Sequence, residues 1–153
     1  GELVVQIAWT GLCRSDACFS TGPEPGFPAT HHTAGHEGIG HVVQAPDPSL
    51  LGRPVATRYP ASTCATCAYC LRGIPESCPA QTNFPKHHSG AFEQFVTAPW
   101  HALLPLPQWG FDGAAEGGVG PVAYAAALCS GSTALKALRR AGVRSGDLVI
   151  VVG

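Results

Sequence analysis

Four of the seven cysteines lie within fifteen residues of one another, and this cluster constrains the fold more than any other feature of the sequence. A disulfide framework usually spreads its pairs along the chain, whereas three cysteines at intervals of three with a fourth nearby can surround one metal ion. Zinc accepts four thiolates in a closed, structural site. We therefore expect a zinc lobe at about residues 60–80, with an iron–sulfur cluster or disulfides as the alternatives. The four candidate ligands are Cys64, Cys67, Cys70 and Cys78.

The composition favours short strands and turns over a bundle of helices. The 19 glycines and 14 prolines make up about a fifth of the 153 residues, and both residue types concentrate in turns. Apolar residues make up 45% of the chain and charged residues 12%, which favours a packed core over disorder. The length corresponds to one domain. The absence of methionine predicts a piece of a longer protein, or one with a trimmed start.

Charge and hydropathy exclude two classes of partner. The formal net charge is -1, whereas proteins that bind nucleic acid or a membrane surface usually carry a basic excess. No apolar run approaches the roughly 20 residues of a membrane span, and no signal peptide is visible. We therefore expect a cytoplasmic protein that binds no nucleic acid and no membrane.

Alternating apolar residues predict a β-rich body. Between residues 2 and 9, every second side chain is large and apolar, which is typical of a strand with one buried face. The segment 20–35 is rich in proline, glycine and threonine and is expected to be a loop. Further strands are expected at residues 39–45, 55–57, 91–97 and 101–104.

After residue 110 the sequence becomes rich in alanine, which predicts helices at residues 122–129 and 132–141. Pro121 suits the start of the first helix, and Gly142 suits the end of the second. The run 147–152 is apolar on both faces, a pattern typical of a central strand in a parallel sheet. The chain is therefore predicted to end in the first strand of an α/β unit.

Three further segments carry metal-ligand residue types, and each is weak evidence alone. Cys13 follows the first predicted strand, His36 precedes the second, and Cys129 lies at the start of the last helix. A lone buried cysteine is usually just a small apolar residue, but two thiolates and one imidazole can hold zinc with a fourth position left open. Asp16 and Glu37 would then be carboxylates close to the ligands. Asp16 could accept a hydrogen bond from the second ring nitrogen of His36.

These motifs, in this order, resemble the zinc-dependent alcohol dehydrogenases of the medium-chain dehydrogenase/reductase family. The resemblance covers nearly the whole chain, and residues 35–43 match the most specific signature of the family. The other segments that carry it are the four-cysteine lobe and residues 1–5, 11–16, 92–96 and 129–138.

The resemblance implies a mainly β fold. A GroES-like, partly open β-barrel with a zinc lobe would span residues 1–128. A linking helix and the first strand of a truncated Rossmann domain would follow at 129–153. No glycine-rich turn follows this last strand, so most of a nucleotide-binding fold and part of the substrate pocket lie outside the chain.

The resemblance also implies two zinc ions per chain. The catalytic ion would be held by Cys13, His36 and Cys129, with Asp16 and Glu37 supporting them. The structural ion would be held by Cys64, Cys67, Cys70 and Cys78. Cysteine rather than glutamate as the third catalytic ligand points to alcohol dehydrogenases proper and away from polyol dehydrogenases.

The same resemblance implies a reaction and roles for three more residues. Ser15 would hold the substrate hydroxyl and begin a proton relay, Arg14 would contact the pyrophosphate of NAD, and Thr133 would pack against the nicotinamide. The implied reaction is the NAD-linked oxidation of a small primary or secondary alcohol to an aldehyde or ketone, and its reverse. The parent enzyme is expected to be a homo-oligomer.

The sequence departs from the family at several points. Many members continue the proton relay with a histidine at the position of Cys18, and a cysteine is a poor proton carrier unless its pKa is lowered. His31 or His32 could substitute for it, or protons could pass through water. The segment 52–55 lacks the usual Gly-Asp pair before the lobe. The glycines of 116–121 follow no predicted strand, so we expect a surface loop there and not a dinucleotide-binding turn.

Two other functions stay open at this point. The chain by itself could be a non-catalytic zinc-binding fragment, because the nucleotide fold is missing. A redox-sensing thiol protein is the third hypothesis, and it depends on Cys18 and the lobe thiols.

Overall fold

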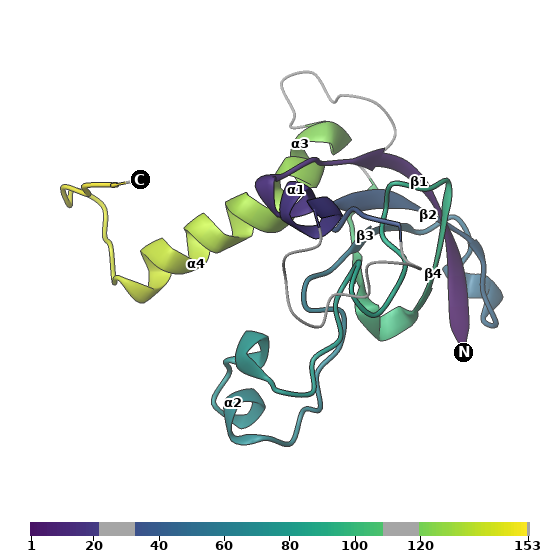
Figure 1. Ribbon diagram of the computed structural model, residues 1–153, viewed down its shortest axis with the longest axis horizontal. Coiled ribbons are helices and arrows are strands. Elements are labelled where there is room, and N and C mark those ends of the chain that lie inside the picture. Colours follow the sequence, from purple (N-terminus) through teal and green to yellow (C-terminus); the bar gives the residue numbers. More distant parts are fainter. Residues whose placement is uncertain (22–32, 109–119, 153) are drawn as a thin grey trace.

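A five-stranded antiparallel sheet, curled into a half-barrel, forms the body of the molecule (Figure 1). The computed structural model describes residues 1–21, 33–108 and 120–152. The order of the strands across the sheet is β4-β1-β2-β3-β5, with each neighbouring pair antiparallel. This confirms the prediction of a mainly β, partly open barrel. The strands are β1 (Glu2–Thr10), β2 (Gly38–Gln44), β3 (Pro54–Thr57), β4 (Phe95–Pro99) and β5 (Leu103–Pro105).

Four α-helices and a π-helical turn are described besides the sheet. Helix α1 (Arg14–Thr21) directly follows β1, and the short helix α2 (Ala68–Leu71) belongs to the four-cysteine lobe, which hangs below the barrel in Figure 1. Helix α3 (Pro121–Ala126), the π-helical turn η5 (Ala127–Gly131) and helix α4 (Ser132–Arg140) form one continuous helical segment. Single 3-10 turns are η1 (Pro48–Leu50), η2 (Pro75–Ser77) and η3 (Trp100–Ala102).

Strand β1 has the buried face that its alternating sequence predicts. Leu3 and Val5 are each only 1% exposed, and Val5 faces a valine on both neighbouring strands. Gly40 of β2 allows the two strands to approach, since a Cβ there would lie 2.0 Å from the carbonyl oxygen of Gln6. Strand β1 therefore has one buried face and is paired along both edges, with β4 on one side and the central strand β2 on the other.

The main core takes side chains from all five strands, and its largest fully buried side chain is Phe84. A smaller cluster of Ile39, Ala56 and Ala125 packs helix α3 against the barrel. The residues of the main core are Leu3, Val5, Val42, Val55, Ala61, Phe84, Val96, Ala98, Ala102 and Leu103.

Two predicted strands begin later than expected. The strand predicted at 91–97 begins at Phe95, because Ala91 and Phe92 donate their backbone N–H groups to Gly35 and Ala34 and so cannot join the sheet. The strand predicted at 101–104 begins at Leu103, after the turn η3.

The helical predictions for the alanine-rich segment are confirmed. Pro121 occupies the first turn of α3, and Gly142 follows α4 with a φ of 69°, a conformation that glycine adopts without strain. Helix α1 was not anticipated, and it takes up residues that were expected to begin a loop at position 20.

The strand predicted at 147–152 is wrong for this structure. These residues are not part of any sheet, and Leu148 and Val152 are each 91% exposed. A strand gains its backbone hydrogen bonds from neighbouring strands, and none of the described strands pairs with this segment. The pattern is still that of a buried strand, but its partners are not among the described residues.

Candidate metal centres and the pocket beside them

The four lobe cysteines converge as the sequence predicts. Their sulfur atoms are 3.6 Å apart for Cys67 and Cys70, 3.6 Å for Cys64 and Cys78, and 4.0 Å for Cys64 and Cys70. Two zinc–sulfur bonds of about 2.3 Å at a tetrahedral angle would place sulfurs about 3.8 Å apart. All four cysteines are free thiols, and a disulfide would need a separation of about 2.05 Å. The lobe therefore fits one tetrahedral ion.

The lobe has little apolar core of its own. Helix α2 and the turn η2 contain no buried residue, and among the ligands only Cys78 is buried. Backbone N–H groups point at the sulfurs instead. The N–H of Cys67 lies 3.3 Å from Cys64 Sγ, and the N–H of Cys64 lies 3.5 Å from Cys78 Sγ. The fold of the lobe thus depends on its thiolates and on what binds them.

The lobe thiols differ in acidity. A hydrogen bond from the backbone of Thr66 is the largest of the contacts that lower the pKa of Cys64 to about 6. Burial raises the pKa of Cys70 to about 11. Zinc binds thiolates, so a metal entering this lobe would have to displace the proton of Cys70, whereas Cys64 is already largely ionised near neutral pH.

A second cluster assembles from three segments that are far apart in the sequence. Cys13 Sγ lies 3.2 Å from His36 Nε2 and 3.9 Å from Cys129 Sγ. A carboxylate oxygen of Glu37 completes the group, and all four ligand atoms lie within 4.8 Å of one another. Glu37, which the sequence predicted only as a supporting carboxylate, therefore lies within the group of candidate ligand atoms itself. Two thiolates and an imidazole in this arrangement fit zinc.

Asp16 holds two of these ligands at once. Its Oδ2 accepts a hydrogen bond from the backbone N–H of Cys13 at 3.0 Å, and its Oδ1 lies 3.1 Å from His36 Nδ1. Asp16 is 3% exposed and His36 is 4% exposed. A carboxylate on Nδ1 leaves Nε2 free to bind a metal, which is the arrangement that the sequence predicts.

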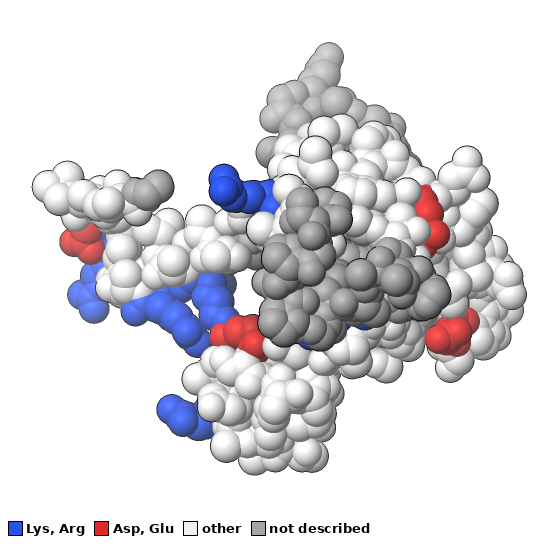
Figure 2. Space-filling view, in the orientation of Figure 1, with Lys and Arg blue, Asp and Glu red and all other residues white. Residues whose placement is uncertain are grey.

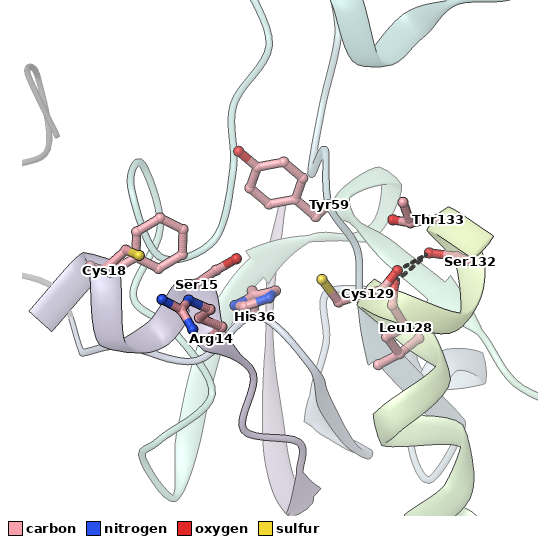
Figure 3. A pocket seen from close by; sticks show the side chains of 10 residues that line it. Arg14, Ser15, Cys18, His36, Tyr59, Leu128, Cys129, Ser132 and Thr133 are labelled. Carbon is pink, nitrogen blue, oxygen red and sulfur yellow. Dashed lines mark hydrogen bonds between the residues drawn. The ribbon is translucent and has the colours of Figure 1, made fainter. Parts of the chain in front are cut away.

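Each ligand is positioned by a different element. Cys13 lies between β1 and the first turn of α1, and its sulfur also receives the N–H of Ser15 at 3.3 Å. His36 precedes β2, where the hydroxyl of Thr57 donates to its carbonyl oxygen at 3.1 Å. Cys129 lies in the π-helical turn η5. Ser132 Oγ donates to the carbonyl oxygens of both Leu128 and Cys129 and so closes this turn (Figure 3).

The electrostatics of this cluster suit a bound cation. Burial is the main cause that raises the pKa of Glu37, and the charge of His36 opposes it. Burial, followed by the charge of Cys13, raises the pKa of Cys129 to about 11. A nearby divalent ion would reverse both shifts because it favours the ionised forms. Without a cation, burial therefore disfavours the ionised forms of both groups.

A pocket of about 420 Å³ opens beside His36 and Cys129. Figure 3 shows Arg14, Ser15 and Thr133 around it. Arg14 and Ser15 belong to the first turn of α1, and Thr133 belongs to α4. The lining residues are Arg14, Ser15, Cys18, Phe19, His36, Tyr59, Leu128, Cys129, Ser132 and Thr133.

Two aromatic walls of this pocket were missed by the sequence analysis. The ring centroids of Phe19 and Tyr59 lie 5.8 Å and 6.3 Å from that of His36, and both contacts are edge-on. Phe19 follows Ser15 by four residues on α1, so recognition of that helix would have placed it on the same face. Tyr59 lies just after β3, where only the tertiary structure turns its ring toward His36.

The residues discussed for the proton relay fall in two groups. Cys18 is exposed and lines the pocket on α1. His31 and His32 lie outside the described residues, as does most of the expected loop at 116–121.

None of the described helices is both long and apolar enough to cross a membrane.

Comparisons with known proteins agree with this geometry. Residues 1–108 match the family model of the alcohol dehydrogenase GroES-like domain. The whole chain aligns at 31% identity with an alcohol dehydrogenase of Geobacillus stearothermophilus and covers 43% of it. It aligns at 28% identity with an alcohol dehydrogenase of Moraxella sp. (strain TAE123) and covers 44% of that protein. The chain therefore spans less than half the length of these curated relatives.

Solved structures are similar over almost all of the chain. An NAD-dependent alcohol dehydrogenase superposes with a TM-score of 0.76 at 25% identity, over 95% of this chain and 41% of that one. Acetophenone reductase from Geotrichum candidum NBRC 4597, in complex with NAD, gives a TM-score of 0.75 at 26% identity, with the same coverage. Both matches extend over the barrel, the lobe and the helical segment.

Proposed function

The chain belongs to the alcohol dehydrogenase GroES-like domain family, and from this premise we propose that it is the metal-binding catalytic part of a zinc-dependent, NAD-linked alcohol dehydrogenase. One observation carries the proposal. Cys13, His36 and Cys129 meet beside a pocket that also contains Ser15. The catalytic domain corresponds to residues 1–128, and residues 129–153 lead into a cofactor domain.

The donor sets fit zinc at both centres. Cys13, His36 and Cys129 would hold a catalytic ion, and the four lobe cysteines would hold a structural one. When bound, zinc supplies Lewis acidity, which lowers the pKa of an alcohol toward neutrality. Asp16 keeps the His36 ring in the orientation that presents Nε2.

The remaining pocket residues handle the proton and the cofactor. Ser15 would accept the hydroxyl proton of the substrate and pass it toward solvent along the face of α1 that carries Cys18. Arg14 would pair with the pyrophosphate of NAD, because a guanidinium binds phosphate oxygens through two parallel hydrogen bonds. Thr133 would pack against the nicotinamide, which accepts the hydride. The substrates are small alcohols and the corresponding aldehydes or ketones, and the parent enzyme is a homo-oligomer.

Metal analysis of the folded chain tests the two sites. The unsubstituted 153-residue chain should contain two zinc ions, while Cys129→Ser and Cys64→Ser should each lose one of them. A content of one zinc ion or none in the unsubstituted chain would contradict the assignment of two zinc sites. Retention of both ions by either variant would show that the ligands were wrongly chosen.

Activity separates this function from the alternative, a zinc-binding fragment without catalysis. The chain spans only 43% of a curated relative, so the 153-residue chain with NAD and a primary alcohol should form no NADH. The parent protein, with its nucleotide-binding fold, should form NADH and should lose this activity in the Ser15→Ala variant. A parent protein that retains two zinc ions but oxidises no alcohol would favour the alternative.

A further inference from the structure

A single carboxylate joins the four-cysteine lobe to helix α4. Oε1 of Glu76 lies 3.2 Å from Nη2 of Arg140 and makes a second ion pair with Nζ of Lys136. The two cations are four residues apart, so they share one face of α4. Figure 2 shows this contact as a red patch on the lobe beside the blue side chains of α4. Glu76 thus links two elements that are distant in the sequence.

On the lobe side, Glu76 lies in a turn that one of the four cysteines closes. It is the central residue of the turn η2, which the N–H of Cys78 closes by donating to the carbonyl oxygen of Pro75 at 3.0 Å. The side chain of Gln81 donates to the carbonyl oxygen of Glu76 at 3.2 Å. Cys78 is a predicted ligand of the lobe ion, so the position of Glu76 depends on whether that site is assembled.

On the helix side, the cations belong to the same continuous helix as Cys129. Lys136 follows Cys129 by seven residues, which is about two helical turns. Ser132 fastens the start of α4 to the π-helical turn through the carbonyl oxygen of Cys129 at 2.9 Å. A contact that holds α4 in place therefore also helps to hold Cys129 Sγ in the catalytic cluster.

We propose that Glu76 is a positioning residue that couples the two metal centres. An assembled lobe presents Glu76 to Lys136 and Arg140, and the docked helix keeps Cys129 beside Cys13. Occupancy of the lobe site thereby raises the metal affinity of the catalytic site, and by linkage the reverse also holds. This inference rests on the proposed function, because it takes both clusters to be metal sites.

The expected coupling is modest. The side chain of Glu76 is 34% exposed, and those of Lys136 and Arg140 are 42% and 58% exposed, so solvent screens both pairs. Exposed ion pairs typically change an equilibrium by about two- to fivefold. We therefore expect Glu76→Gln to weaken metal binding at the catalytic site by about this factor.

Cobalt(II) titration of the full chain tests the coupling. The lobe is first filled with zinc, and Co²⁺ binding at the remaining site is followed by its absorption, with Cys129→Ser identifying the band of that site. The dissociation constant is compared for the parent, Glu76→Gln and the double variant Lys136→Gln/Arg140→Gln. Glu2→Gln is the matched control, since it removes one exposed carboxylate from β1. Circular dichroism verifies that each variant is folded.

The Glu76 and double variants should both bind Co²⁺ about two- to fivefold more weakly, and Glu2→Gln should match the parent. Emptying the lobe with Cys64→Ser should weaken Co²⁺ binding in the parent more than in Glu76→Gln. Equal affinities for the parent and Glu76→Gln, or equal losses in Glu76→Gln and Glu2→Gln, would overturn the coupling. Absence of the Cys129-dependent band from the parent chain would overturn the proposed function as well.

Discussion

At the scale of single residues, Asp16 shows how much one side chain does in this molecule. It fixes the backbone of Cys13 and the ring of His36 from opposite oxygens of one carboxylate. The sequence predicted this contact because the spacing of the motifs places an acceptor near a histidine ligand. It did not predict Glu37 as a member of the ligand group, because only the folded chain brings that carboxylate within 4.8 Å of the sulfurs.

The bond between Asp16 and His36 leads to a prediction. Asp16→Asn keeps the shape of the side chain but loses its negative charge, so the metal affinity of the catalytic site should fall by about tenfold or more. A competition titration with a zinc chelator measures this affinity. Asp47→Asn, at a distant exposed turn, should leave the affinity unchanged. An unchanged affinity in Asp16→Asn would show that the hydrogen bond does not orient His36.

At the scale of elements, the sequence predicted what depends on local pattern and missed what depends on partners. Strand β1 and the helical segment after Pro121 follow from periodicity and terminal residues. The two turns of α1 have no strong apolar stripe, and contacts between Asp16 and its neighbours fix their position. The pocket walls Phe19 and Tyr59 were missed for the same reason, because tertiary packing aims their rings.

The close approach of β1 and β2 predicts an effect on stability. Gly40→Ala would place a Cβ 2.0 Å from the carbonyl oxygen of Gln6, so the strands must separate. We expect a loss of about 1–3 kcal/mol in the free energy of unfolding. Gly120→Ala is the control, since its Cβ would meet no atom of the described residues within 4 Å. Chemical denaturation compares the two, and equal stabilities would contradict the prediction.

The turn η1 predicts a pH dependence. Asp47 accepts the N–H of Ser49 at 2.9 Å, and this backbone hydrogen bond is the main cause that lowers the pKa of Asp47 below 3.8. A lowered pKa means that the ionised carboxylate stabilises the fold above pH about 4, and that this contribution is lost as the pH falls through the folded value. The stability difference between the parent and Asp47→Ala, measured in urea at matched pH, should shrink below pH about 4. A constant difference would contradict this sign.

At the scale of the whole molecule, the barrel and the lobe are stabilised in different ways. The barrel is stabilised by apolar burial around Phe84, whereas the lobe has almost no buried side chain and depends on its thiolates. Alternation predicted a β-rich body and cysteine spacing predicted the lobe, whereas the barrel itself was expected only from the family resemblance. It was wrong about residues 147–152, because an apolar run predicts a strand without supplying its neighbours.

This difference predicts how the molecule responds to metal removal. A chelator should expose the amides that close the lobe turns, such as those of Leu71, Ile74 and Cys78, to hydrogen exchange. The amide of Val42, at the centre of the barrel, should keep its protection because its environment contains no metal ligand. Hydrogen–deuterium exchange with and without chelator measures both. Equal deprotection of lobe and barrel would show that they unfold as one unit.

The π-helical turn that carries Cys129 also has a consequence for insertions and deletions. Each residue of a helix turns the chain by about 100°, so a deletion between Cys129 and Lys136 would rotate that sulfur relative to the cations of α4. The barrel contributes no residue to this stretch and would fold as before. A chain with this deletion would therefore keep its three ligand residues but lose the register between Cys129 and the cations that pair with Glu76. Within this helix, the length of the segment matters as much as the identity of its residues.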